Sequence, residues 1–319
     1  MELIFTNPAW EDEGVLRDYA FDLAYGTDEN DFELTLAGNQ RCETGSLVYI
    51  DGTEYGGIVD GVRVVTRSNE LTYFGRTWHG VLASKIIEPD SGEDYLIVSG
   101  EVNKVIRKLV TRAGLSELFT VSALDSGLTI SNYQIERYVD TYTAIMKMLS
   151  KVSGKLNFTF RQGKVVLSAC PVVDYSEDEQ FDTSQVEMEL EVKSAVNHLI
   201  CLGKGELAER QVVHLYTDGQ GNISETQLLF GLDEITAVYD YSNVESLEAL
   251  IESGKQKLAE YAVTDIVRMD FDAEKFIYDI GDIVGAADVI TDISAKEKIV
   301  KKIVTIKNGL VNIEYKVGE

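Results

Sequence analysis

Several residues of the kinds that carry out chemistry lie close together in one stretch of the chain. The sequence NHLICLGKGELAERQVVH, residues 197–214, contains His198, Cys201, His214 and a Gly-Lys-Gly around Lys204. Such residues could form a phosphate-binding loop, a metal site or a nucleophile with its base. Their spacing decides between these chemistries.

A phosphate-binding loop requires Gly, four residues, Gly-Lys and then Ser or Thr. Counted back from Lys204, the first glycine position holds His198, and Gly205 follows the lysine where a hydroxyl is needed for magnesium. The motif fails at both ends. The Gly-Lys-Gly is therefore interpreted as a turn that closes a strand.

A zinc site fails on geometry. If residues 197–203 form a strand, His198 and Cys201 lie three positions apart and point to opposite faces. Only two of His198, Cys201 and His214 could then meet, and the chain has no Cys-x-x-Cys pair to add to them. Cys201 is better interpreted as a small core residue, and we expect no metal and no cofactor.

No catalytic residue is assigned. The chain lacks the Gly-x-Ser-x-Gly of a nucleophile elbow and any family-type cysteine signature. With 54 acidic residues, pairs of carboxylates occur by chance and carry no information. We therefore expect a protein that is not an enzyme.

The segment YFGRTWHGVLASKIIEP, residues 73–89, is the densest in special side chains, and two interpretations of it compete. Arg76, Trp78 and His79 could bind a sugar or a peptide. We favour an amphipathic strand that passes into a turn, with Trp78 in the core and Arg76 at a subunit contact, because aromatic residues and arginine are enriched at protein interfaces. The candidate subunit-interface residues are Arg76, Trp78, His79 and Lys204.

Composition limits the classes of function. The 319 residues suffice for about two domains, and 45% are hydrophobic, so a packed core is expected. The net charge of −25 disfavours binding to nucleic acid or anionic lipid. No apolar run approaches the ~20 residues of a membrane span, and the N-terminus does not resemble a signal peptide, which predicts synthesis in the cytoplasm. Cys42, Cys170 and Cys201 are too few and too widely spaced for a disulfide framework.

Alternating polar and apolar residues predict mostly β structure. Residues 31–36 read as a half-buried strand with Phe32, Leu34 and Leu36 on one face. Two Asp-Gly pairs within residues 46–66 predict turns of a hairpin or meander. Further hairpins are predicted to turn at Gly163 and near Asp218.

Three segments predict helices. Residues 101–114 place Val102, Val105, Ile106, Leu109 and Val110 on one face and end at a glycine. A second helix is predicted over 131–154 and a third over 242–262, because each begins with a capping-box pattern, Ser131 with Gln134 and Ser242 with Glu245.

The chain also shows a candidate linker and a weak internal repeat. The acidic residues 174–185 contain few core residues and form the best linker candidate. Segments starting at Gly45 and Gly281 share a pattern of Gly-polar-apolar-Val, a polar turn, Ile-Val and a final alternating strand. The pattern is explained equally well by two ordinary hairpins or by two copies of one small barrel.

Five segments together carry a resemblance to a known family. The segments are YFGRTWHGVLASKIIEP, DYLIVSGEVNKVI, NHLICLGKGELAERQVVHLY, DEITAVYDY and the ending DIGDIVGAADVI with KKIVTIKNGLVNIEYKVGE. In this order they resemble the tail-associated baseplate hub proteins of phages and prophages of Gram-positive bacteria, which are similar in plan to the hub of contractile tails. The resemblance implies an α+β, mainly β fold with two similar β-barrel "tube" domains. We expect the first barrel at 1–95, an α+β insert with two helices at 96–175 and the second barrel at 176–319.

The resemblance also implies a function. It implies a homotrimer in the virion tail that adapts a six-fold tail tube to a three-fold tip and lets DNA pass through its channel without specific binding. The implied partners are a distal tail protein hexamer and a spike, fibre or tail-tip lysin, with a tape-measure protein as a further candidate. Many such proteins continue into a fibre or a peptidoglycan-cleaving domain, whereas this sequence ends at Glu319. The alternatives are a tail-tip peptidoglycan hydrolase or endopeptidase and a cell-wall carbohydrate-binding module using Trp78 and Tyr73.

Overall fold

The chain forms two compact units. The computed structural model describes residues 1–65, 70–176, 186–191, 196–218, 222–262, 266–271, 278–288, 293–307 and 309–318. The first unit comprises Met1–Met188 and Arg268–Glu319, and the second comprises Glu189–Val267. The described residues are mainly strands with a few helices, which confirms the α+β, mainly β class. The three domains expected at 1–95, 96–175 and 176–319 stay a prediction, although the compact units are bounded differently.

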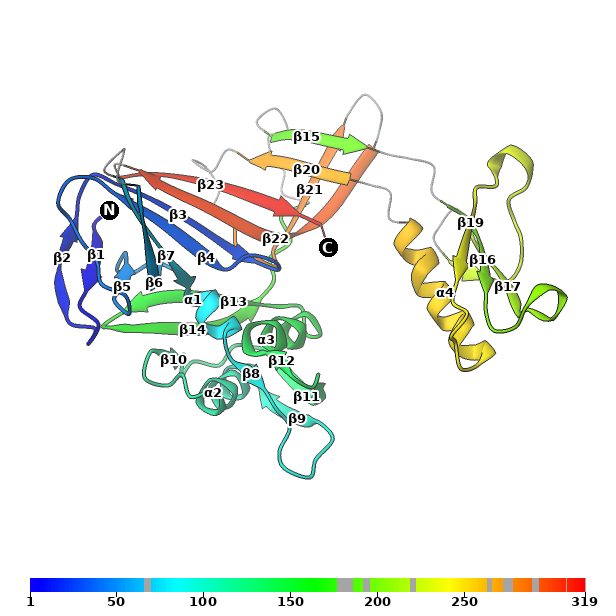
Figure 1. The fold of residues 1–319 in the computed structure, drawn as a ribbon, viewed down its shortest axis with the longest axis horizontal. Helices are drawn as coiled ribbons and strands as arrows, with labels where there is room; N and C mark the ends of the chain where they lie inside the picture. The colour runs from blue at the N-terminus through cyan, green and yellow to red at the C-terminus, as the bar shows by residue number, and fades with distance from the viewer. Residues whose placement is uncertain are drawn as a thin grey trace. The chain divides into compact units, whose positions relative to one another are not determined.

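Ten strands of the first unit form one sheet, in the order β2-β1-β5-β6-β7-β4-β3-β22-β21, with β23 also paired to β22 (Figure 1). These strands are β1 (Leu3–Thr6), β2 (Asp12–Leu16), β3 (Tyr19–Gly26), β4 (Asp31–Leu36), β5 (Leu47–Tyr49), β6 (Gly56–Val65), β7 (Glu70–Thr77), β21 (Ile283–Asp288), β22 (Ile293–Lys307) and β23 (Leu310–Val317). In β4 the side chains of Phe32, Leu34 and Leu36 are buried, as their alternation predicts. The sheet therefore joins the two ends of the chain.

The two segments of the weak internal repeat, which start at Gly45 and Gly281, lie in this same sheet. The segment after Gly45 forms the antiparallel pair β5–β6, and the segment after Gly281 forms the antiparallel pair β21–β22. Within the described residues the sheet does not close into a barrel. Strand β22 pairs with β3, and the partners Val304–Leu23 and Ile306–Phe21 are buried. Cross-strand apolar pairs of this kind stabilise the joining of the C-terminal strands to the N-terminal ones.

One predicted turn is a bulge. Asp51-Gly52 lies between β5 and β6, and Gly52 has a φ of 75°. Asp60-Gly61 instead lies inside β6, where the pairing with β7 shifts register between Val59 and Gly61. A bulge redirects side chains locally, and here it places Asp60 beside β7.

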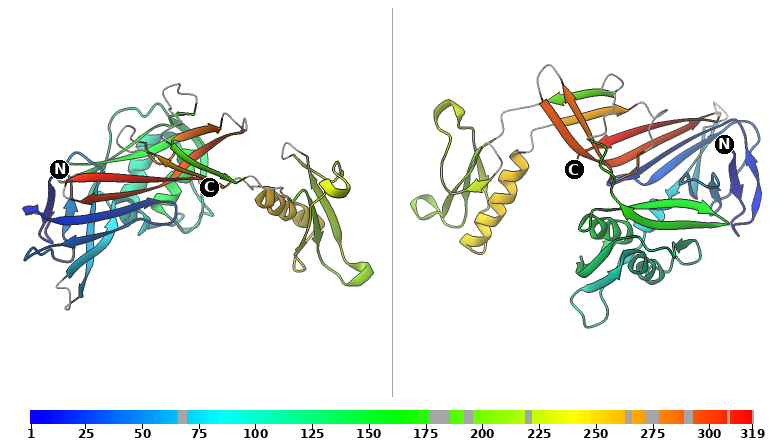
Figure 2. Two further views of the ribbon diagram at one scale, coloured as in Figure 1. Left: turned by 90° about the horizontal axis from the view of Figure 1, so that it is seen from above. Right: turned by 180° about the vertical axis from the view of Figure 1, so that it is seen from behind.

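A second layer of the first unit holds three helices and smaller sheets. The elements are α1 (Trp78–Ala83), β8 (Ile86–Ile87), β9 (Leu96–Glu101), α2 (Val102–Arg112), β10 (Phe119–Val121), β11 (Thr129–Ile135), β12 (Val139–Asp140), α3 (Thr141–Ser150), β13 (Gly154–Arg161) and β14 (Lys164–Pro171). Strands β13 and β14 lie between the large sheet and the helices α2 and α3 (Figure 1, Figure 2). They form a hairpin with Gly163 in its turn, as predicted.

The helix predicted over 101–114 is confirmed as α2. All five residues of its predicted face are buried. The carboxylate of Glu101 accepts hydrogen bonds from the backbone N–H groups of Asn103 and Lys104, and so caps the first turn. Gly114 follows the helix with a φ of 72°.

The helix predicted over 131–154 is wrong in its first part. Residues 129–135 form β11, which pairs with β9. The helix α3 begins at Thr141, where the carboxylate of Asp140 accepts a hydrogen bond from the backbone N–H of Thr143 at 2.8 Å. Ser131 and Gln134 match the capping box by sequence alone, because the strand partner that overrides the pattern is about thirty residues away.

The second unit is a four-stranded sheet with one helix. Its elements are β16 (His198–Leu202), a 3-10 turn (Leu207–Glu209), β17 (Val212–Thr217), β18 (Ile223–Ser224), a 3-10 turn (Gly231–Asp233), β19 (Thr236–Asp240) and α4 (Leu247–Ala262). The strand order is β18-β17-β16-β19, and β15 (Val186–Glu191) pairs with β20 (Ile266–Phe271). Helix α4 lies along one face of the four-stranded sheet (Figure 2).

Two further predictions concern this region. Helix α4 starts later than its predicted capping box at Ser242, and the hydroxyl of Ser246 accepts from the backbone N–H of Ala249. Most of the candidate linker at 174–185 lies outside the described residues. No helix in the described part of the chain is long and apolar enough to span a membrane.

Candidate functional site

The stretch 197–214 forms a pair of antiparallel strands, as predicted. Cys201 in β16 is fully buried in the core between the sheet and α4. Gly254 of α4 allows this close packing, because a Cβ there would lie 2.5 Å from the Sγ of Cys201. Burial raises the pKa of the Cys201 thiol, which makes it a poor nucleophile. The interpretation of Cys201 as a core residue is confirmed.

The two histidines of this stretch meet on the opposite face of the sheet from Cys201. The Nε2 of His198 lies 2.8 Å from the Nδ1 of His214, and the Nδ1 of His198 lies 2.6 Å from the Oε1 of Glu234. Tyr216 stacks on His198 with ring centroids 4.4 Å apart. Two histidines with one carboxylate that contacts only the first do not make a metal site. In the described residues no group of three or more His, Cys, Asp or Glu could hold a metal ion.

This histidine cluster also differs from a catalytic triad. In a triad the nucleophile and the acid bond to opposite nitrogens of the histidine ring. Here the hydroxyl of Thr236 lies 3.2 Å from the Nδ1 of His198, the same nitrogen that contacts Glu234. The hydroxyl is therefore not activated by the cluster. Its geometry supports a structural role for the two histidines.

Arg76 is held by its own chain. Its Nε and one terminal nitrogen bond to the two carboxylate oxygens of Asp60 at 2.8 and 2.7 Å, and the carboxylate raises the pKa of Arg76. Asp60 reaches Arg76 because of the bulge in β6. Arg76 remains partly exposed and Lys204 is exposed, so a role for these two at a subunit interface stays a prediction.

The other two residues of the predicted interface set are in the core. Residues 78–83 form the helix α1 after β7, where the sequence predicts a strand passing into a turn, and the hydroxyl of Thr77 caps it. Trp78 is fully buried and His79 is 3% exposed. Neither side chain reaches the surface of the chain, because helix α1 turns both into the space between the two layers. Trp78 therefore lies in the core, as the favoured interpretation predicts, and a role for Trp78 and His79 at a subunit interface stays a prediction.

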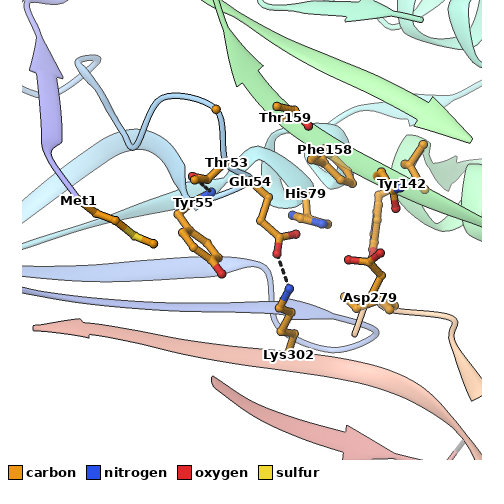
Figure 3. Close-up of a pocket in the computed structure, with 14 residues that line it drawn as sticks. Met1, Thr53, Glu54, Tyr55, His79, Tyr142, Phe158, Thr159, Asp279 and Lys302 are labelled. Atoms are coloured by element: carbon orange, nitrogen blue, oxygen red, sulfur yellow. Dashed lines mark hydrogen bonds and ion pairs between the residues drawn. The ribbon is translucent and has the colours of Figure 1, made fainter. Parts of the chain in front are cut away.

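A cavity of about 370 Å³ lies beside His79 in the first unit. It is lined by loop residues between β5 and β6, by α1, by α3, by β13 and by the C-terminal strands (Figure 3). Glu54 and Lys302 point toward one another across it and form an ion pair (Figure 3). Asp279 lies at its edge and binds the Nζ of Lys155 at 2.8 Å.

Burial controls the protonation of the groups around the cavity. Burial lowers the pKa of His79 to about 3, and the charge of Lys302 adds to the shift, so the imidazole is neutral at physiological pH. Burial alone would lower the pKa of Lys302, but the carboxylate of Glu54 outweighs it and raises the pKa. Burial raises the pKa of Tyr55 to about 12. The cavity is therefore lined by one neutral imidazole and by one ion pair whose lysine stays protonated.

Sequence reasoning did not find this cavity, although one signal points to it. Lys302, Val304 and Ile306 are two positions apart in β22, so their side chains lie on the same face of the strand, and all three are buried. A lysine in phase with core residues of a strand is unusual, because fully buried lysines occur almost only with a partner. The partner, Glu54, lies 248 positions earlier in the chain and cannot be recognised by local pattern.

The fold itself is found in solved proteins of phage tails. Two of them match over the entire chain at 12% identity. They are the prophage tail protein gp18 from Listeria monocytogenes EGD-e, with a TM-score of 0.52 and 95% of that chain covered, and the 43 kDa tail protein of prophage MuSo2 from Shewanella oneidensis, with a TM-score of 0.54 and 98% covered. No family model and no curated protein matches the sequence. The likeness at this identity concerns the fold, which is that of phage and prophage tail proteins.

Proposed function

We propose that this protein is a structural component of a phage or prophage tail. The observation that carries the proposal is the likeness of fold to two prophage tail proteins over all of this chain and nearly all of theirs. The histidine cluster of the second unit lacks an activated nucleophile, which agrees with a structural role for that cluster. The protein is proposed to act in the virion tail.

Within the tail, we propose the position of the baseplate hub. The hub would be a homotrimer in which each chain contributes two similar tube domains. These two domains would be built on the hairpins β5–β6 and β21–β22, which contain the two segments of the internal repeat. The six tube domains of the trimer would match the six-fold symmetry of the tail tube, and the three chains would match a three-fold tip that takes part in host attachment. The net charge of −25 supports a channel that repels DNA phosphate within a Debye length of about 8 Å.

The proposed partners follow from this position. A distal tail protein hexamer would bind on one side of the ring, and a spike, fibre or tail-tip lysin on the other. Arg76 and Lys204 are the exposed candidates for contacts between chains. Edge strands of the sheet would pair or pack across subunits, which would solve the problem of unpaired backbone groups.

The oligomeric state tests the hub proposal. Light scattering is expected to give three times the 35.4 kDa of one chain, and negative-stain images are expected to show a three-fold ring with a central hole. Because the chains repel one another electrostatically, the trimer should be favoured by higher salt. A monomer at high concentration and high salt, also after addition of a distal tail protein, would overturn the hub assignment but not the tail fold.

A zymogram tests the structural role itself. The purified protein is expected to leave Gram-positive cell walls intact. Clear lysis that His214→Ala abolishes would contradict a purely structural role and would favour a tail-tip peptidoglycan hydrolase.

A further inference from the structure

A second cavity of the first unit, of about 280 Å³, lies beside helix α3. Among the described residues it shares only Tyr142 and Ile280 with the cavity beside His79. Residues 143, 146, 147 and 150 of α3 line one side, since positions three and four apart lie on one face of a helix. Residues 298–300 of β22 also line it. The cavity therefore lies where the large sheet meets the helical layer.

The buried part of its lining is apolar. The buried lining residues are Gly26, Tyr142, Gly154, Gly281 and Ile299. None of them carries a charged side chain, and Met146 and Val300 add partly buried apolar side chains. Apolar surface gains free energy when an apolar group displaces water from it. The buried part of the cavity therefore suits the apolar body of a ligand.

The exposed part of the lining is cationic. The exposed lining residues are Thr27, Lys147, Ser150 and Lys298. No Asp or Glu lies among the described residues that line this cavity, whereas Glu54 and Asp279 line the cavity beside His79. Two lysines without a lining carboxylate are unusual in a chain with 54 acidic and 29 basic residues. The exposed part therefore suits an anionic group.

Both lysines are available to a ligand. The side chain of Lys298 makes no hydrogen bond or ion pair with another described residue. Lys147 pairs with Glu136 at 2.7 Å, but 49% and 60% of the two side chains are exposed. An ion pair that is so exposed contributes little to stability, so the carboxylate of a ligand can compete with Glu136.

The negative charge of the whole chain does not prevent an anion from binding here. Exposed charges more than about 8 Å away are screened at physiological salt, so the lysines of the lining dominate. A carboxylate at the exposed end also keeps part of its hydration, which a charge at the buried end would lose. The lining therefore orients a ligand with its apolar body inward and its carboxylate outward.

We propose that this cavity binds a small amphipathic carboxylate, with its apolar body against Tyr142 and Ile299 and its carboxylate at Lys298. The volume lies just below the range of about 300–1,000 Å³ for pockets of drug-sized ligands, so the ligand is smaller than these. It is a free aliphatic or aromatic acid or the C-terminal residue of a polypeptide, which share this chemistry. The proposal rests on the cavity alone and is independent of the proposed tail function. Its alternative is a cavity filled only by water.

Methionine signals test the proposal. Met146 lines this cavity, whereas Met1 lines the cavity beside His79 and serves as an internal control. With methionine labelled with carbon-13 at its methyl group, the full chain is titrated with hexanoate, hexan-1-ol, hexylamine and acetate, and the Met146 signal is identified by its loss in Met146→Leu. We expect hexanoate to shift Met146 and not Met1, with a dissociation constant of about 10 mM or lower. Hexan-1-ol lacks the charge, acetate lacks the apolar body and hexylamine has the opposite charge, so all three should bind more weakly.

The free acid and the C-terminal residue are distinguished by N-acetyl-leucine, which carries an apolar side chain, a carboxylate and a peptide-like amide. If N-acetyl-leucine binds more tightly than hexanoate, the ligand is the C-terminal residue of a polypeptide. If hexanoate binds more tightly, the ligand is a free acid.

Two variants of exposed lysines in β22 sharpen the test. Lys298→Gln removes the charge at the cavity and should weaken hexanoate binding about fivefold, with hexan-1-ol binding unchanged. Lys307→Gln is the matched control, because Lys307 is exposed in the same strand and does not line the cavity. It should leave the binding of both molecules unchanged.

Four results would overturn the proposal. They are the absence of a Met146 shift with hexanoate, an equal shift of Met1, binding of hexan-1-ol or hexylamine as tight as that of hexanoate, and equal hexanoate affinity of Lys298→Gln and Lys307→Gln. The first three use the wild-type protein, so they decide the question even if a variant fails to fold.

Discussion

The buried ion pair between Lys302 and Glu54 offers the most decisive test of the fold. Lys302 has 1% of its side chain exposed and Glu54 has 19%. Removal of one partner therefore leaves the other with a largely buried charge that has no counter-charge. Loss of one partner of a buried pair costs about 3–5 kcal/mol. Because Glu54 retains some contact with water, Lys302→Met should lower the free energy of unfolding by about 3 kcal/mol.

The neighbouring lysine is a matched control. Lys301 is also buried, but its partners Asp28 and Glu29 are 71% and 46% exposed. When Lys301→Met removes the ammonium, both carboxylates return to water, so the expected cost is about 1 kcal/mol. The double variant Lys302→Met with Glu54→Gln leaves no buried charge without a counter-charge. It should therefore recover part of the free energy of unfolding that Lys302→Met loses.

Tryptophan fluorescence reports the unfolding of the first unit alone, because Trp10 and Trp78 are the chain's two tryptophans and both lie in that unit. Unfolding in urea should show the midpoint of Lys302→Met lowered by about 1 M, with the slope unchanged. The reasoning is refuted if Lys302→Met costs no more than Lys301→Met, or if the double variant loses the full sum of the single losses.

Three further outcomes are expected. Burial lowers the pKa of His79 to about 3 from 6.5, so below pH 6.5 the unfolded chain binds a proton that the folded chain does not. Stability should therefore fall by about 2 kcal/mol between pH 7 and pH 5, and His79→Phe should show a smaller fall in urea titrations at the two pH values. Gly75→Ala should destabilise by about 1–3 kcal/mol in the same assay, because its Cβ would lie 1.9 Å from the carbonyl oxygen of Ile58; an unchanged midpoint would contradict the close approach of β6 and β7. Glu101→Ala should cost about 1 kcal/mol through loss of the α2 cap, and Glu117→Ala, on an exposed turn, should cost nothing measurable.

Local patterns predicted much of the secondary structure. The alternation in β4, the apolar face of α2 and the turn at Gly163 are all present as predicted. These features depend on residues within about a dozen positions of each other, so periodicity and turn chemistry suffice to recognise them.

The errors occur where a distant partner overrides a local pattern. Residues 131–135 match the start of a capped helix but belong to β11, which pairs with β9. Asp60-Gly61 matches a turn but is a bulge opposite β7, where Asp60 binds Arg76. In both cases the local preference is worth at most about 1 kcal/mol, and the pairing and packing of the partner strand outweigh it.

The candidate cavity could not be predicted at all. Its residues come from the N-terminal strand region, three separate elements of the second layer and β22. The phase of Lys302 within β22 indicates that a charge is buried, but the sequence contains 54 carboxylates that could pair with it. Only the tertiary structure shows that Glu54 is the carboxylate that pairs with Lys302.

The sequence by itself determined the mainly β class, the acidic character and the failure of the stretch 197–214 as a site. In a strand, side chains three positions apart point to opposite faces, and this period alone separates His198 from Cys201. The tertiary structure decided that His79 is a buried neutral group, that the C-terminal strands complete the N-terminal sheet and that Lys302 meets Glu54. The physical reason is that a local period specifies which face of an element is apolar, whereas the surface it packs against depends on strand pairing between residues hundreds of positions apart.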